Sequence, residues 1–302
     1  MDAELQMPPT FRTCIGKRRD FGEITPETAC VHGADAAPSV VIWGDSHAGV
    51  LVDPLARLLA PHGLSVRELT LAGCPPVPGL DSPGVGEYAI CEDHNRRMFQ
   101  YLLTDSAIKL VILHAYWNHK VQRIDYDNGA GDIKVDRAYL FKAGSNTDQS
   151  DTDRFAELTT VISDEVKALR AAGKQVIIIG PVPDPGFNVL DRIAMRYWKQ
   201  GGPGAPITIP AKAALDYGAP TRQILTDAAR AGGAQWIDPA PLFCVEGGVC
   251  TLTADGKALY FDDNHLALLG VQRLMPQIVA AVRVALGDTA LSATNLHHRD
   301  SR

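Results

Sequence analysis

The sequence predicts an α/β domain built on a parallel sheet, with helices packed on both faces of that sheet. Short runs of apolar, mostly β-branched residues alternate with segments whose apolar residues recur at helical spacing. Such alternation is typical of parallel strands joined by helical crossovers. The chain has 302 residues, of which 46% are hydrophobic and 21% are charged, so it can form the core of one large domain.

Five apolar runs are predicted as strands, at residues 40–43, 64–71, 109–114, 175–179 and 235–237. Five helical segments follow from apolar residues that repeat every three or four positions. These segments lie at residues 48–59, 92–103, 155–171, 221–231 and 266–286. Ligands bind beyond the carboxyl ends of the strands in sheets of this type, so the turn after residue 43 is a candidate site.

The other segments suggest one domain with two excursions. Residues 36–287 are expected to form the domain, and residues 121–151 and 183–219 are rich in polar residues, Gly or Pro and lack a clear period. Residues 1–35 are expected to form an irregular lead-in that disulfides tether. Residues 288–302 are expected to form a disordered tail.

Charge and hydropathy exclude several classes of partner. The net charge is −6 and the longest basic run is Lys17-Arg18-Arg19, so no nucleic-acid partner is expected. No window holds the 18 or more apolar residues that a membrane span requires. The first 19 residues lack the apolar core of a signal peptide, which suggests a domain excised from a longer chain.

The six cysteines favour an oxidising compartment. Six cysteines allow 15 pairings, and pairing between sequence neighbours is the simplest. Each bridge would stabilise the fold by roughly 2–4 kcal/mol. No C-x-x-C pair is present, which argues against zinc. The alternative is six free thiols in a reducing compartment, whereas disulfides predict the periplasm or the cell exterior. The predicted pairs are Cys14–Cys30, Cys74–Cys91 and Cys244–Cys250.

The segment Gly44-Asp45-Ser46-His47 directly follows the first predicted strand. A serine at this corner lies at the carboxyl edge of the sheet, where backbone N–H groups at a helix start face any oxyanion that forms. Ser46 is therefore a candidate nucleophile, and Asp45 is expected to bond backbone N–H groups of the turn. The alternative is that Ser46 serves only as a helix N-cap.

A serine hydroxyl needs a base to remove its proton, and His265 is the candidate. His47 is adjacent to the serine, but neighbouring side chains on a turn diverge. Asp262 precedes His265 by three residues, a spacing that places both side chains on one face. Asp262 would accept the Nδ1–H of His265 and leave Nε2 to deprotonate Ser46. The alternatives are a helix-capping aspartate beside a surface histidine, or a pair of metal ligands.

Over residues 14–285, the chain resembles the SGNH, or GDSL-like, hydrolase superfamily. It is most similar to the extracytoplasmic SGNH domains that are fused to, or work beside, integral-membrane acyltransferases that O-acetylate lipopolysaccharide or peptidoglycan. The resemblance implies a flavodoxin-like, three-layer α/β/α fold with a parallel five-stranded sheet. The matching residues are Gly44-Asp45-Ser46-His47-Ala48, Gly73-Cys74-Pro75-Pro76, Trp117, Gly180-Pro181-Val182-Pro183, Cys244, Cys250, Tyr260-Phe261-Asp262, His265-Leu266 and Gly270.

The resemblance also implies roles for individual residues. It implies Ser46 as nucleophile, His265 as base and Asp262 as the carboxylate that orients the base. The family builds its oxyanion hole from the serine N–H, a glycine N–H matched by Gly73, and an asparagine side chain. The family's G-x-N-D block is absent, and Asn118 is the candidate for the third donor.

Several other side chains are weighed against ordinary structural roles. Trp117 and His47 are candidate substrate contacts, and Trp198 could stack on a sugar ring, although aromatic residues near strand ends more often belong to the core. Residues 125–136 depart from the EF-hand pattern, so calcium is not expected. The histidines His94, His114 and His119 are too scattered to suggest zinc. No metal or cofactor is expected.

The function implied by the resemblance is serine-dependent O-acetyl transfer to an extracytoplasmic glycan. The partners would be an acetyl donor, a glycan acceptor and an integral-membrane acyltransferase domain in the same or a neighbouring chain. With water as the acceptor, the same site would act as an esterase. The alternatives are a stand-alone carbohydrate acetyl esterase and a non-catalytic glycan-binding module.

Overall fold

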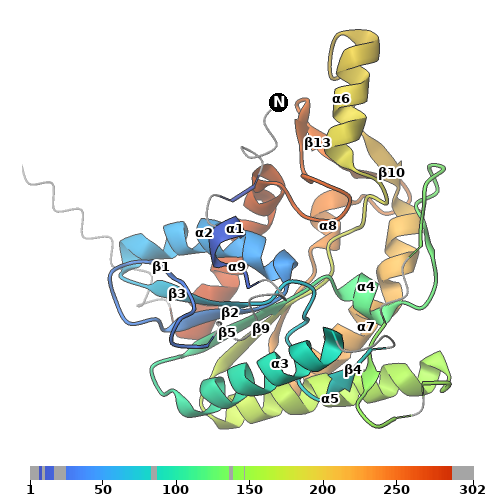
Figure 1. Ribbon diagram of the computed structural model, residues 1–302. Coiled ribbons are helices and arrows are strands. Elements are labelled where there is room, and N and C mark those ends of the chain that lie inside the picture. The colour runs from blue at the N-terminus through green and yellow to red at the C-terminus, as the bar shows by residue number, and fades with distance from the viewer. Residues whose placement is uncertain are drawn as a thin grey trace, which may run out of the picture.

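The computed structural model describes residues 7–8, 11–16, 25–82, 87–135, 139–145 and 147–287. A six-stranded sheet forms its centre, with the strands in the spatial order β1-β3-β2-β5-β9-β11 (Figure 1). The five predicted strands are all present within one residue of their predicted bounds. The six strands are β1 (Val31–Gly33), β2 (Val40–Gly44), β3 (Ser65–Thr70), β5 (Leu110–His114), β9 (Gln175–Ile179) and β11 (Gln235–Ile237).

The sheet is mixed, because one edge strand runs against the others. β2 pairs in parallel with β3 and β5, β5 with β9, and β9 with β11. β1 pairs antiparallel with β3. The predicted five-stranded parallel sheet is confirmed, but β1 lies within the segment expected to be irregular. Two of its three residues are exposed, so it gives no apolar run in the sequence.

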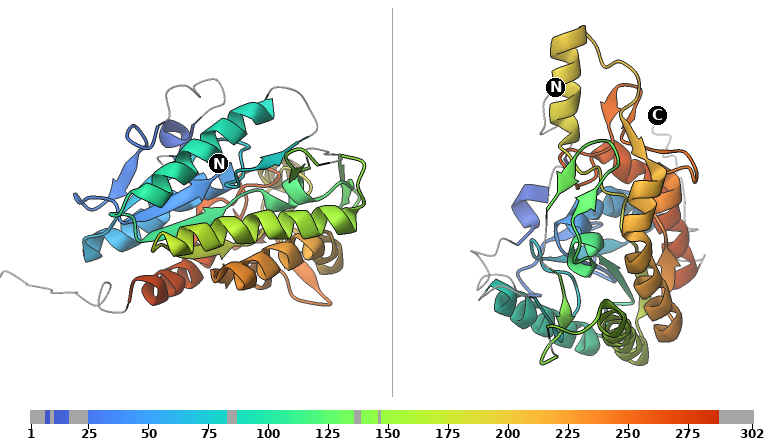
Figure 2. Two further views of the ribbon diagram at one scale, coloured as in Figure 1. Left: turned by 90° about the horizontal axis from the view of Figure 1, so that it is seen from below. Right: turned by 90° about the vertical axis from the view of Figure 1, so that its right-hand side faces the viewer.

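Helices cover both faces of the sheet and produce three layers (Figure 1 and Figure 2). Alternate side chains of β2 point to opposite faces, and all five of its residues are buried, as in strands covered on both sides. The helices α2 (Ser46–Leu59) and α9 (Leu268–Leu286) pack on the face that includes Ile42. The other face, which includes Trp43, is covered by α3 (Glu87–Thr104), α5 (Asp151–Ala171) and α7 (Ala211–Gly232).

The helix α7 begins at Ala211, well before the predicted start at residue 221. Pro220 lies inside the helix and interrupts the helical pattern in the sequence, because proline removes a hydrogen bond from a helix interior. Packing of α7 against α5 and the sheet outweighs this local loss. The segment at 183–219 is therefore partly helical rather than irregular.

Both excursions contain secondary structure of their own. The first carries short strand pairs, and the second carries α6 (Val189–Gln200), which stands out from the body of the molecule in Figure 1. The remaining helices are α1 (Phe11–Cys14), η3 (Ala60–His62), α4 (Trp117–Val121) and α8 (Ala240–Phe243). The remaining strands are β4 (Leu80–Asp81), β6 (Tyr126–Asp127), β7 (Ile133–Lys134), β8 (Phe141–Lys142), β10 (Thr208–Pro210), β12 (Val249–Thr251), β13 (Thr253–Ala254) and β14 (Lys257–Ala258).

Among the described helices, α9 alone is long and apolar enough to cross a membrane by length and composition. One face of the helix, which includes Leu274 and Ile278, packs into the core, whereas Val284 on α9 is 74% exposed. A Cβ atom on Gly270 would lie 2.2 Å from the carbonyl oxygen of Leu259, so glycine is needed where α9 approaches that chain. The helix therefore fits the outer layer of an α/β domain.

The three predicted disulfides are confirmed as Cys14–Cys30, Cys74–Cys91 and Cys244–Cys250. The described part of the chain contains no free cysteine. The first bridge ties α1 to the segment before β1, and the second ties the loop after β3 to α3. Their sequence separations of 16 and 17 residues correspond to about 3 kcal/mol of stabilisation each in the chain-entropy model. The expected tail at 288–302 lies outside the described residues.

Candidate active site

Ser46 lies at the carboxyl end of β2, where the strand turns directly into α2. The turn depends on Gly44, because a Cβ atom there would lie 1.8 Å from the carbonyl oxygen of His114 in the neighbouring strand. Asp45 is the N-cap of α2, and Ser46 is the first helical residue. The alternative role considered for Ser46, that of N-cap, is therefore filled by Asp45.

The Asp45 carboxylate holds the turn together, as the sequence predicts. One oxygen accepts the N–H of His47 at 2.8 Å, and the other accepts the N–H of Tyr116 at 2.9 Å. Burial raises the pKa of Asp45, although these two N–H donors oppose the rise. The carboxylate thus joins the start of α2 to the segment after β5 and leaves the Ser46 hydroxyl free for other contacts.

Asp262 organises the turn that carries His265. Asp262 Oδ1 accepts the backbone N–H groups of Asn264 and His265 at 2.9 and 2.7 Å. The other oxygen, Oδ2, lies 2.7 Å from Nδ1 of His265. The backbone carbonyl of Asp262 also accepts the N–H of Val189 at the start of α6. Asp262 is therefore fixed from several directions before it contacts the imidazole.

The imidazole of His265 links this carboxylate to the serine. His265 Nε2 lies 2.7 Å from Ser46 Oγ, so the two groups predicted from opposite ends of the chain come together. Because Asp262 Oδ2 can only accept, Nδ1 carries a proton and Nε2 is left to accept the serine proton. Burial raises the pKa of Asp262, but the hydrogen bond and charge of His265, together with the two backbone N–H groups, hold it below its usual value.

The loop after β3 lies beside the serine turn. The N–H of Leu71 donates to the carbonyl of Gly44 at 3.0 Å, which joins the ends of β3 and β2. Gly73 has φ of 72°, in the left-handed region that favours glycine. Within the described residues, the Gly73 N–H makes no backbone hydrogen bond. The Cys74–Cys91 disulfide anchors the next residue of this loop to α3.

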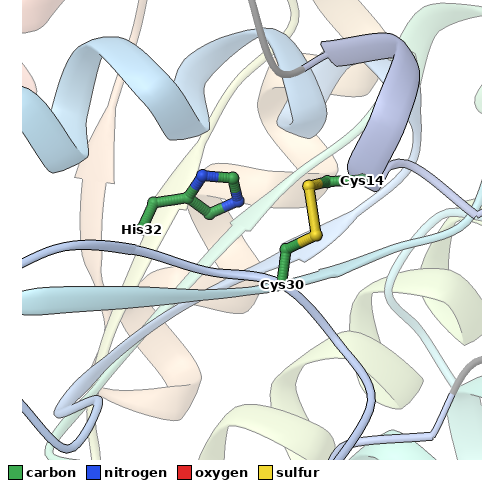
Figure 3. A group of neighbouring side chains, drawn as sticks. All are labelled: Cys14, Cys30 and His32. Atoms are coloured by element: carbon green, nitrogen blue, oxygen red, sulfur yellow. A yellow bond between two sulfur atoms is a disulfide. The ribbon is translucent and has the colours of Figure 1, made fainter.

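One cluster has the composition of a metal site but not its chemistry. The side chains of Cys14, Cys30 and His32 lie close together, and Figure 3 shows a disulfide bond joining the two sulfur atoms. Thiolates are the sulfur ligands of metals, so the oxidised pair offers none. His32 Nε2 lies 3.0 Å from a carboxylate oxygen of Glu68. These residues therefore serve as a tether and an ion pair.

Comparison with known protein families gives one match that covers most of the chain. The model of the SGNH domain fused to AT3 domains matches residues 13–280. The chain belongs to this SGNH domain family. A search of curated proteins finds no match.

Solved structures with the SGNH fold resemble the domain at low sequence identity. The periplasmic domain of a lipopolysaccharide acetyltransferase from Salmonella ser. Paratyphi A has a TM-score of 0.52 and 15% identity, and the match covers 82% of this chain and 84% of that one. A carbohydrate acetylesterase from Sinorhizobium meliloti has a TM-score of 0.41 and 14% identity, covering 83% and 99%. The first likeness supports the α/β/α fold of this SGNH domain.

The amide of Asn118, the candidate third oxyanion donor, is engaged by a neighbouring carboxylate. It is buried in α4, and its Nδ2 donates to Asp184 Oδ2 at 3.0 Å. A Cβ atom on Gly218 of α7 would lie 3.5 Å from both polar atoms of the Asn118 amide. The amide therefore packs against α7 and Asp184, a contact that does not support its expected role in the oxyanion hole.

Trp117 and His47 are also too deeply buried to contact a sugar. Trp117 is 1% exposed, and its indole N–H donates to the carbonyl of Ile179. His47 is 2% exposed and lies between other aromatic rings. Their expected role as substrate contacts is therefore not supported, because both side chains belong to the packed interior. Trp198 differs, since it is 83% exposed on α6.

Of four further residues around the proposed triad, only Phe261 was named from the sequence, as part of the matching Tyr260-Phe261-Asp262 block. Phe11 of α1 places its ring 6.0 Å from that of His265, and Phe261 stacks on His265 at 5.2 Å. Asn264 and Lys134 form hydrogen bonds beside them. Lys134 lies in a polar segment without a period, and Phe11 lies in the lead-in, so neither gave a signal that could be read from the sequence.

Proposed function

We propose that this SGNH domain is a serine-dependent O-acetyltransferase that acts on an extracytoplasmic glycan through an acetyl-serine intermediate. The observation that carries the proposal is the hydrogen-bonded series of Ser46, His265 and Asp262, in which both side-chain contacts of the imidazole are 2.7 Å. The family of SGNH domains fused to AT3 domains supports acyl transfer or ester hydrolysis as the reaction class.

In the first half-reaction, Ser46 Oγ attacks the carbonyl carbon of the acetyl donor. The serine proton passes to Nε2 of His265, and the Asp262 carboxylate stabilises the imidazolium that forms. When the tetrahedral intermediate collapses, the bond to the leaving group breaks and His265 returns its proton to that group. The product is acetyl-Ser46, with His265 neutral again.

Backbone donors are proposed to stabilise the oxyanion of the tetrahedral intermediate. The N–H of Ser46 at the start of α2 and the N–H of Gly73 are the two candidates. The helix start adds a favourable dipole for negative charge. With Asn118 held against α7, the hole would have two assigned donors. One missing donor typically costs about 10²–10³ in rate, which suits slow transfer to a glycan.

The second half-reaction repeats the sequence with a sugar hydroxyl as the nucleophile. The hydroxyl gives its proton to His265 Nε2, its oxygen bonds to the acetyl carbon, and the bond to Ser46 Oγ breaks as the serine recovers a proton. Water can replace the sugar, because the side chains of His265 and Asp262 remain 18% and 28% exposed. The esterase alternative is therefore the same chemistry with a different acceptor.

The proposed compartment of this domain and its proposed partner are supported by the disulfides and by the family. Three disulfides support an extracytoplasmic domain, since such bonds persist in oxidising compartments. The family description pairs SGNH domains with AT3 domains, which supports a membrane acyltransferase as the source of the acetyl group. An acceptor on the same side of the membrane would be a cell-surface glycan.

The test is a transfer assay with an aryl acetate as donor, run with and without lipopolysaccharide or peptidoglycan fragments. Acetylated glycan that depends on Ser46 supports the proposal. Free acetate as the sole product with every acceptor would assign the esterase alternative instead. Ser163→Ala is the matched control, because Ser163 lies on α5 and its hydroxyl contacts only the helix backbone in the described structure. This control should match the unmodified protein in both assays.

A further inference from the structure

Five rings form a column that runs through the candidate active site, in which the rings of His47 and His265 are tilted by 33° and the other three neighbouring pairs are stacked. The ring of His119 lies 5.0 Å from that of Tyr116, and Tyr116 lies 4.5 Å from His47. His47 lies 4.5 Å from His265, which lies 5.2 Å from Phe261. Aromatic rings at about 4.5–7 Å attract each other beyond the effect of area burial. The imidazole of the proposed base is therefore packed within this ring column.

His47 lies in the middle of the ring column, and its own orientation is fixed. It is 2% exposed, and its Nε2 lies 3.0 Å from Asn264 Oδ1. The Asn264 amide is itself oriented, because its Nδ2 donates to Asp263 Oδ1 at 2.7 Å. Since an amide oxygen only accepts, His47 carries its proton on Nε2. The contact therefore selects both the tautomer and the plane of the ring.

Lys134 connects this contact to the other side of the ring column. Its Nζ donates to Asp263 Oδ2 at 2.7 Å and to the hydroxyl oxygen of Tyr116 at 3.0 Å. Tyr116 is the ring that stacks on His47 at an interplanar angle of 11°. Lys134, which belongs to β7 in the first excursion, therefore supports His47 through the polar contacts and through the stack.

We propose that His47 is a positioning residue whose ring keeps the His265 imidazole aimed at Ser46. The inference rests on the proposed function, in which His265 takes the serine proton. The contact between Nδ1 and Asp262 fixes one atom of the imidazole, but a single hydrogen bond leaves the ring able to turn about that atom. The ring of His47, 4.5 Å away, restrains this rotation together with the stacked ring of Phe261, and the two hold Nε2 at 2.7 Å from Ser46 Oγ.

The role also requires His47 to remain neutral. His265 becomes an imidazolium when it accepts the serine proton, and a second positive ring 4.5 Å away would oppose that step. Burial lowers the pKa of His47 well below its ordinary value. Lys134, and His265 and His114 whenever they are protonated, act in the same direction, whereas the hydrogen bond to Asn264 opposes the shift. His47 therefore supports the ring of the base without competing for its proton.

The test compares two substitutions of His47 with a matched control in an aryl acetate assay. His47→Ala removes the ring and is expected to lower kcat about tenfold or more with KM within about twofold, because misplacing a base slows the chemical step. His47→Phe keeps a ring and is expected to recover most of that loss. The control is His94→Ala, which removes a histidine that is equally buried but lies on α3, and its kcat should be unchanged.

An unchanged kcat in His47→Ala, or a loss in His47→Phe as large as that in His47→Ala, would overturn the inference. If His47→Ala does not fold, Asn264→Ala provides a second route, because it keeps the His47 ring and removes its hydrogen bond. That variant should lower kcat several-fold at constant KM, and an unchanged kcat would count against the inference. Ser46→Ala separates the two proposals: if it retains turnover, the proposed function fails irrespective of His47.

Discussion

His265 Nε2 lies 2.7 Å from Ser46 Oγ, although 219 residues separate the two positions in the chain. The sheet brings them together, because Ser46 follows the central strand β2 and His265 lies just before α9, which packs beside α2. Each group is held by an aspartate that bonds backbone N–H groups, Asp45 for the serine turn and Asp262 for the histidine turn. The proposed nucleophile and base are thus held by backbone hydrogen bonds of their own turns.

Asp262→Asn should lower kcat by about 10³–10⁴ with little change in KM. Oδ1 already accepts two backbone N–H groups, so the amide nitrogen of asparagine would take the place of Oδ2. It would then face Nδ1 of His265 as a donor and force the imidazole proton onto Nε2, where the serine proton must arrive. Steady-state kinetics with an aryl acetate test this.

The matched control is Asp238→Asn, since the Asp238 carboxylate accepts the backbone N–H of Ala240 at the start of the short helix α8. Its kcat should remain near that of the unmodified protein. Equal losses in both variants would show that the effect of Asp262→Asn reflects general destabilisation rather than the tautomer of the base.

Removal of the Cys74–Cys91 disulfide should reduce activity more than removal of Cys244–Cys250. The Cys74–Cys91 bridge anchors the residue next to Gly73, the proposed oxyanion donor. The Cys244–Cys250 bridge joins two residues only 6 positions apart in the sequence. Paired serine substitutions are compared for kcat and for unfolding free energy. We expect the first variant to lose about 3 kcal/mol of stability as well as kcat. A kcat unaffected by loosening this loop would argue against Gly73 as a donor.

The disulfides themselves are checked by intact mass. The reduced protein should be about 6 Da heavier than the oxidised one, which is two hydrogens for each of three bridges. A smaller difference would mean that fewer than three of these bridges form in the isolated protein.

The stabilising contribution of the buried, neutral His94 and His114 should fall as the pH falls from about 6.5 toward 4, because both must gain a proton on unfolding. Burial lowers the pKa of His94 and of His114 from 6.5 to about 4, and for His114 a hydrogen bond to Ile179 opposes the shift. The unfolded chain therefore binds more protons than the folded one in this range. Each group supplies up to about 3 kcal/mol above pH 6.5 that is lost near pH 4.

Urea unfolding at pH 7 and pH 5 measures how much a single histidine contributes to the pH dependence of the unfolding free energy. His94→Leu should weaken the pH dependence by about 2 kcal/mol across that interval, since one titrating group is gone. The unmodified protein, measured under the same conditions, is the comparison. An unaltered dependence in His94→Leu would show that His94 does not titrate on unfolding.

Gly44→Ala should prevent normal folding or strongly destabilise the protein. The added Cβ would lie 1.8 Å from the carbonyl oxygen of His114 and 2.7 Å from the Ala48 side chain, and neither neighbour can move without separating β2 from β5 or α2. Gly63→Ala is a useful comparison, because a Cβ there meets nothing within 4 Å, although the positive φ imposes some strain. We expect a lower soluble yield and a lower thermal unfolding midpoint for Gly44→Ala than for Gly63→Ala.

Much of the fold was predictable because its central strands are buried on both faces. The runs at 40–43, 109–114 and 175–179 are almost entirely apolar, and such runs are visible in a single sequence. β1 was missed because its side chains are largely exposed, and the start of α7 was missed because tertiary packing overrides Pro220. An exposed strand leaves no apolar run in the sequence, and packing that keeps a proline inside a helix depends on distant residues.

The proposed triad was predictable because each of its two halves is a compact sequence motif, whereas the residues around it were not predictable. Asn118 was expected to face the oxyanion by its place after the third predicted strand, but the orientation of α4 turns its amide toward Asp184. Trp117 follows the same strand, and as the first residue of α4 it is buried. Lys134, Asn264 and the ring column depend on side-chain packing between distant segments, which residue spacing alone does not describe.

The most direct test of the central claim is rapid mixing with an aryl acetate, an acid quench, and mass analysis of the peptide that contains Ser46. We expect one acetyl group on Ser46 in the unmodified protein, and neither this adduct nor turnover in Ser46→Ala. Turnover that persists in Ser46→Ala, with the acetyl group absent from this peptide in both proteins, would contradict the assignment of Ser46 as the nucleophile.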